Sequence, residues 1–105
     1  SAAVLGSAGE WVHYAASKAA VDTLTVGLAQ EVATEGVRVN AIAVGLVDTG
    51  FHESSGEADR PARIRPTVPM KRSGTPEEVA AAVVWLLSDA ASYTTGTVLA
   101  VSGGR

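Results

Sequence analysis

The sequence predicts an α/β fold in which helices alternate with parallel strands. Two short β-branched segments each follow a stretch with helical spacing, and strands separated by helices pair in parallel. The composition agrees with this fold: 47% of the 105 residues are hydrophobic and only 5% are aromatic, so Ala, Val and Leu build most of the core. A chain of this length forms at most one domain.

The first helix is predicted after a loop at residues 1–13, where small residues show no sustained period. Apolar side chains at helical spacing and a second face of small side chains continue from Lys18 to Thr34, and Glu35-Gly36 is a stop signal. We expect this helix to be buried on two faces, one against a sheet and one against another helix or a partner subunit. Residues 37–44, bounded by glycines, predict the first strand.

A polar segment with three glycines and three prolines follows at residues 45–69. Its part from 50 to 69 predicts a substrate lid, which can contain short helices. Thr75-Pro76-Glu77-Glu78 then predicts a helix start, because Thr75 can cap the helix and Glu78 can complete a capping box. The second helix has a broad apolar face, with Trp85 expected in the core. Residues 97–101 predict the second strand.

Composition excludes several classes of function. The formal net charge of −3 argues against a nucleic-acid partner or an anionic membrane surface, and the apolar runs are too short to span a bilayer. The chain has no cysteine, which excludes disulfides, thiolate catalysis and Cys-based zinc sites and fits a cytoplasmic location. His13 and His52 lack ligand-like spacing, so no metal site is expected.

Tyr14 and Lys18 form the main candidate for chemistry. Positions four apart lie on one face of a helix, so the phenol and the ammonium can point into one site. A nearby cation favours the phenolate, which predicts a pair able to move a proton to or from an alcohol oxygen.

These motifs together resemble the short-chain dehydrogenase/reductase family over essentially the whole chain. Ser1 lies thirteen positions before Tyr14, as the substrate-orienting serine of the family does, and Tyr14-x-x-x-Lys18 is similar to its catalytic motif. Further segments that resemble the family are its sixth strand at 37–42, its Pro-Gly-x-x-x-Thr turn at 44–49, and its last helix and strand at 69–79 and 95–104. Val44 stands where proline is usual, and Ser102 where aspartate is common.

The resemblance implies the C-terminal part of a Rossmann-type doubly wound parallel sheet, with two strands, two main helices and a lid. Residues 1–105 would be the catalytic half of one NAD(P)-binding domain. The glycine-rich pyrophosphate turn and the family's catalytic asparagine have no counterpart in the sequence. We therefore expect the 105 residues alone to be inactive, and the choice between NAD and NADP stays open.

The resemblance also implies roles for single residues. Tyr14 would be the acid in carbonyl reduction and the base in alcohol oxidation, and Lys18 would also bind the nicotinamide-ribose hydroxyls. Ser1 would hydrogen-bond the substrate oxygen. The remaining candidates are Gly45, Val47 and Thr49 around the nicotinamide carboxamide, and Trp11, His13 and His52 near the substrate.

The implied substrate is a small-molecule alcohol or carbonyl compound, as in bacterial sugar dehydrogenases and 3-oxoacyl-carrier-protein reductases. A homo-oligomer, either tetramer or dimer, would form through the helix at 18–34. The alternative is a truncated, non-catalytic fragment that serves as an interaction or structural piece. A hydrolase built on Ser7, His13 and Asp22 is disfavoured, because the sequence contains no Gly-x-Ser-x-Gly elbow.

Overall fold

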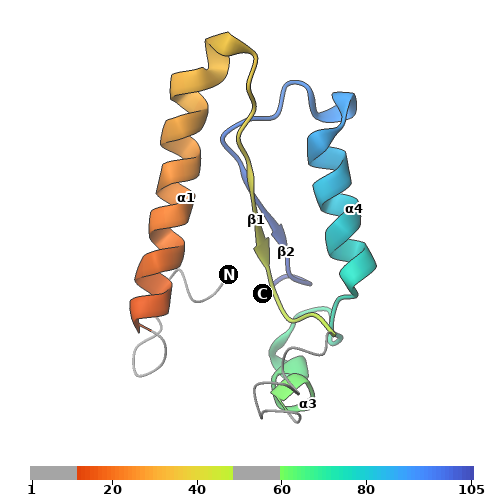
Figure 1. Ribbon diagram of the computed structural model, residues 1–105. Helices are drawn as coiled ribbons and strands as arrows, with labels where there is room; N and C mark the ends of the chain where they lie inside the picture. The colour runs from red at the N-terminus through yellow and green to blue at the C-terminus, as the bar shows by residue number, and fades with distance from the viewer. Residues whose placement is uncertain (1–11, 49–59) are drawn as a thin grey trace.

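Two parallel strands form the centre of the computed structural model, which describes residues 12–48 and 60–105 (Figure 1). Strand β1 (Ala41–Val44) pairs with β2 (Val98–Val101) in parallel, with Ala41 opposite Val98. Helix α1 (Val12–Val32) and helix α4 (Pro76–Leu87) flank the strand pair on opposite sides of the view. The predicted α/β class with parallel pairing is confirmed.

Helix α1 begins at Val12, within the stretch 1–13 that was predicted to be a loop. Its regular part ends at Val32, before Thr34, and the last turn tightens to the 3₁₀ helix η2 (Ala33–Glu35). Gly36 follows with a φ of 75°, and its N–H donates to the carbonyl of Ala33 at 3.3 Å. Glycine adopts this left-handed conformation without steric cost, so the predicted stop is confirmed.

Strand β1 is shorter than the predicted strand at 37–44. Before Ala41 the regular ladder gives way to contacts that use side chains: the N–H of Val39 donates to the hydroxyl of Thr95 at 3.1 Å. The amide of Asn40 donates to the carbonyl of Thr94 at 3.0 Å and accepts from the N–H of Thr97 at 3.1 Å. These side chains satisfy backbone groups that a longer ladder would pair.

Arg38 closes the C-terminal end of α4. Its guanidinium donates to the carbonyls of Leu86 at 2.6 Å, Thr94 at 3.3 Å and Ser88 at 3.4 Å. The last carbonyls of a helix have no partner within the helix, and a cation also complements the negative end of the helix dipole. Arg38 therefore joins the segment before β1 to the far end of α4.

Large apolar side chains remain exposed on both main helices. Leu24 on α1 is 64% exposed, and Trp85 and Leu87 on α4 are 45% and 77% exposed. The prediction that Trp85 lies in the core is wrong for this chain, because α4 buries Leu86 and the described residues do not cover Trp85. Burial of such exposed apolar surface against another element stabilises the folded protein.

The described part of the predicted lid contains two short helices, as expected: α3 (Arg60–Ile64) and the 3₁₀ helix η3 (Arg65–Thr67). Val68 follows and is 1% exposed, and the N–H of Met70 donates to the carbonyl of Gly103 at 3.0 Å. The end of this segment is thus fixed to the turn after β2. Among the described residues, no helix has the length and hydropathy needed to cross a bilayer.

Candidate functional site

One end of the molecule gathers the elements that carry the predicted site. The beginning of α1, the carboxyl ends of β1 and β2, and the beginning of α4 all lie there (Figure 1). In open parallel sheets, ligands bind outside the carboxyl ends of the strands. The turn after β1 is therefore a candidate binding surface.

Gly45 begins this turn, where β1 and the chain after β2 approach closely. Its N–H donates to the carbonyl of Val101 at 2.9 Å. A Cβ at this position would lie 2.8 Å from the Cα of Ser102 and 2.9 Å from its Cβ. Only glycine fits here without moving the backbone.

Val47 lies at a short parallel bridge to Gly74. The N–H of Gly74 donates to the carbonyl of Leu46 at 2.9 Å, and the N–H of Asp48 donates to the carbonyl of Gly74 at 3.0 Å. Because Gly74 bonds the residues on either side of Val47, the N–H and C=O of Val47 itself point toward the opposite edge. This edge offers one donor beside one acceptor, which is the complement of a primary carboxamide.

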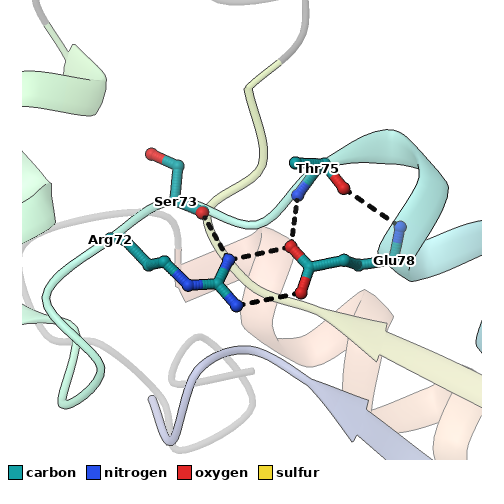
Figure 2. A network of polar contacts seen from close by, with 4 residues as sticks. All are labelled: Arg72, Ser73, Thr75 and Glu78. Carbon is teal, nitrogen blue, oxygen red and sulfur yellow. Dashed lines mark hydrogen bonds and ion pairs between the residues drawn. The ribbon is translucent and has the colours of Figure 1, made fainter.

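A polar network holds the segment that contains Gly74 (Figure 2). The Arg72 guanidinium binds the Glu78 carboxylate through two hydrogen bonds of 2.8 and 2.9 Å, and donates to the carbonyl of Ser73 at 3.1 Å. Glu78 also accepts from the N–H of Thr75 at 3.0 Å, while the Thr75 hydroxyl accepts from the N–H of Glu78 at 3.1 Å. The predicted capping box is confirmed. The Ser73 hydroxyl is buried and has no hydrogen-bond partner in the part of the chain that the structure describes.

The ion pair determines the protonation of Glu78. The hydrogen bond from Arg72, followed by that from the Thr75 backbone, lowers the pKa of Glu78 from 4.5 to about 2. The same carboxylate raises the pKa of Arg72. Both groups therefore stay charged at neutral pH. Beside them a cleft of about 240 Å³ opens between the turns after β1 and β2.

Tyr14 and Lys18 share one face of the first turns of α1, as predicted. The Nζ of Lys18 lies over the Tyr14 ring, 5.3 Å from its centroid. Tyr14 is 43% exposed. In the same turn, the Ser17 hydroxyl donates to the carbonyl of His13 at 3.0 Å. The pair is accessible in the first turns of α1, and the beginning of this helix lies at the same end of the molecule as the carboxyl ends of the strands (Figure 1).

The predicted site residues are therefore described in part. His13, Tyr14 and Lys18 lie on α1, and Gly45 and Val47 lie on the turn after β1. Ser1, Trp11, Thr49 and His52 lie outside the described residues. Within residues 12–48 and 60–105, no group of three or more acidic or histidine side chains could hold a metal ion.

Sequence reasoning missed the pairing of Arg72 with Glu78 and its connection to Gly74. The capping box singled out Glu78, but Arg72 precedes the helix at a separation that neither helical nor strand periodicity explains. Whether a loop arginine such as Arg72 reaches Glu78 with both nitrogens depends on the three-dimensional path of the loop, which the sequence pattern does not give.

Several relatives in sequence are oxidoreductases by name. The family model described as Enoyl-(Acyl carrier protein) reductase matches residues 1–105. The uncharacterized oxidoreductase YgfF of Escherichia coli (strain K12) is 54% identical over 101 residues, which cover 96% of this chain and 41% of that protein. The 3beta-hydroxysteroid dehydrogenase 1 of Eggerthella lenta is 50% identical over 98 residues, which cover 90% of this chain and 38% of that protein. The chain thus spans about two fifths of the length of these relatives.

Solved structures agree. An NADPH-bound short chain oxidoreductase from Pseudomonas aeruginosa PAO1, described as containing an atypical catalytic center, superposes with a TM-score of 0.83 at 36% identity, over 99% of this chain and 42% of that one. A 4-hydroxyisoleucine dehydrogenase complexed with NADH gives a TM-score of 0.86 at 28% identity, over 99% of this chain and 43% of that one. With a family model that matches all 105 residues, these neighbours show that the chain belongs to the short-chain dehydrogenase/reductase family and forms an α/β part of its Rossmann fold.

Proposed function

We propose that the whole protein transfers a hydride between NAD or NADP and an alcohol/carbonyl pair, and that this chain supplies the proton transfer. The observation that carries the proposal is the accessible Tyr14–Lys18 pair at the beginning of α1, which lies at the same end of the molecule as the carboxyl ends of the strands. Structural neighbours described as bound to NADPH and to NADH support a nicotinamide cofactor.

The turn after β1 fits such a cofactor. The backbone edge of Val47 carries the donor and acceptor that a carboxamide needs, and Gly45 lets the turn begin close to Ser102. Thr49 would add a hydroxyl at the end of this turn. When bound, the nicotinamide supplies a hydride to the carbonyl carbon or accepts one from the alcohol carbon.

The residues of this chain handle the proton. In reduction, the Tyr14 hydroxyl donates its proton to the carbonyl oxygen as the C–H bond forms, and in oxidation the phenolate takes that proton back. Lys18 places a positive charge beside the phenol and would bind the ribose hydroxyls. Ser1 would hydrogen-bond the substrate oxygen. The overall reduction consumes one carbonyl compound, one NAD(P)H and one proton.

Replacement of Tyr14 with phenylalanine tests this role in the whole protein. We expect kcat to fall by roughly 10²–10⁴-fold, the usual contribution of a general acid–base group, while the Kd for NAD(P)H stays unchanged. Tyr93→Phe is the matched control, because the Tyr93 side chain is fully exposed on the turn after α4. Turnover near the wild-type level in Tyr14→Phe would refute the mechanism.

Substrate choice and assembly belong to the same proposal. The lid at 50–69, together with Trp11, His13 and His52, would select a small alcohol or carbonyl compound. The exposed apolar face of α1, which includes Leu24, favours assembly of a homo-oligomer. Size-exclusion chromatography with light scattering on the whole protein measures the number of subunits.

A second proposal concerns the 105 residues in isolation, which would act only as an interaction or structural piece. It is supported by the absence of a glycine-rich dinucleotide turn from the sequence and by the apolar surfaces left open on α1 and α4. Mass spectrometry first verifies that the sample is the intact 105-residue chain. Titration of this isolated chain with NAD(P)H is then expected to show no saturable binding. Micromolar affinity in that sample would overturn this second proposal.

A further inference from the structure

We propose that Arg72 and Glu78 are positioning residues for the backbone edge at Val47 that would hold the nicotinamide. The inference rests on the proposed function and deepens it. Neither side chain acts on the substrate. They act through Gly74, whose two backbone bonds determine where the turn after β1 lies.

The segment around Gly74 is closed by contacts to one carboxylate. The guanidinium of Arg72 and the N–H of Thr75 both bind the Glu78 carboxylate, so the residues before and after Gly74 are tied to one side chain (Figure 2). Glu78 is itself fixed in the first turn of α4 by the capping box with Thr75. A bidentate Arg–carboxylate pair adds directional restraint that a single contact lacks.

Two backbone hydrogen bonds connect this closed segment to the residues beside Val47. Gly74 donates to the carbonyl of Leu46 and accepts from the N–H of Asp48, at 2.9 and 3.0 Å. These two bonds hold the peptide groups on both sides of Val47. A shift of Gly74 would therefore tilt the N–H and C=O of Val47 away from a bound carboxamide.

The segment before Gly74 also needs such a restraint. Lys71, directly before Arg72, has a φ of 61°, a conformation that residues with a Cβ rarely adopt. Its backbone N–H donates to the carbonyl of Val68 at 2.8 Å, and its ammonium donates to the carbonyl of Pro66 at 2.8 Å. Strained backbone persists where surrounding contacts hold it, and the Arg72–Glu78 pair holds its C-terminal side.

The test compares ligands with and without the nicotinamide in the whole protein. In Glu78→Ala, the Kd for NADH or NADPH should rise by about tenfold, the equivalent of roughly one lost hydrogen bond. The Kd for ADP-ribose or its 2′-phosphate, which lack the nicotinamide, should stay within about twofold because they do not reach Val47. Glu77→Ala removes the neighbouring carboxylate of the same helical turn, which makes no contact in this network, and should change neither affinity.

Glu78→Gln is the conservative variant that should recover most of the affinity. A glutamine oxygen can still accept from the N–H of Thr75 and from Arg72, although it cannot form the charged pair. Equal weakening of NADH and ADP-ribose in both Glu78 variants, or unchanged NADH affinity in Glu78→Ala, would overturn the positioning role alone. Absence of NADH and NADPH binding in the wild type would overturn the proposed function, and this inference with it.

Discussion

Replacing Gly45 with alanine should destabilise the protein by about 2–4 kcal/mol, since the added Cβ collides with backbone that cannot rotate away. The Cβ would lie 2.8 Å from the Cα, 2.9 Å from the Cβ and 3.2 Å from the carbonyl oxygen of Ser102. Overpacking of this kind costs about 1–3 kcal/mol. Separation of the two segments would also stretch the 2.9 Å hydrogen bond from Gly45 to Val101, which adds about 1 kcal/mol.

Thermal unfolding of the whole protein measures this effect, with Gly74→Ala as the matched control. Gly74 lies at the same end of the sheet, has no positive φ, and a Cβ there would meet its nearest atom, the Leu46 carbonyl oxygen, at an ordinary 3.6 Å. We expect Tm to fall by roughly 5–10 °C in Gly45→Ala and to change by less than about 2 °C in Gly74→Ala. Equal Tm values for the two variants would refute the close-approach argument.

Two further predictions concern the charged groups at the two ends of α4. Arg38→Met should lower the unfolding free energy, measured in urea, by about 2–3 kcal/mol because three carbonyls lose a charged donor. The control Arg65→Met should lower it by less than about 0.5 kcal/mol, because the exposed partner of Arg65, Asp48, is 4.0 Å away. A similarly small loss of unfolding free energy in both variants would contradict the capping role of Arg38. Because the pKa of Glu78 is lowered to about 2 in the folded protein, its stabilisation is complete above the ordinary value of 4.5 and is lost as pH falls through 2. The difference in unfolding free energy between wild type and Glu78→Gln should therefore narrow as pH falls from 4.5 to 2, and a constant difference would contradict the assignment.

The parts of the fold that could be predicted from the sequence are those with local causes. Thr75 and Glu78 cap α4 through contacts within one turn, and Gly36 ends α1 through its own backbone conformation. The Tyr14–Lys18 pair shares a face because the spacing of a helix requires it. In each case the residues that decide the structure are neighbours in the chain.

The parts that could not be predicted depend on residues far apart in sequence. The first half of the expected strand at 37–44 does not join the ladder, because Asn40 and Val39 bond to side-chain and loop groups before β2. Arg38 caps helix α4 by binding the carbonyl of Leu86, which lies 48 positions later in the sequence. Trp85 is exposed because burial of an apolar helix face needs a covering surface, and the described residues of this chain do not supply one.

Equilibrium titration of the whole protein with NADH and NADPH tests most directly the proposal that this chain forms part of a nicotinamide-dependent oxidoreductase. Nicotinamide fluorescence reports occupancy without any assumption about the substrate. We expect saturable binding of at least one of the two dinucleotides, with a dissociation constant in the micromolar range, about 1–100 μM. Absence of saturable binding by either dinucleotide to the folded whole protein would contradict it.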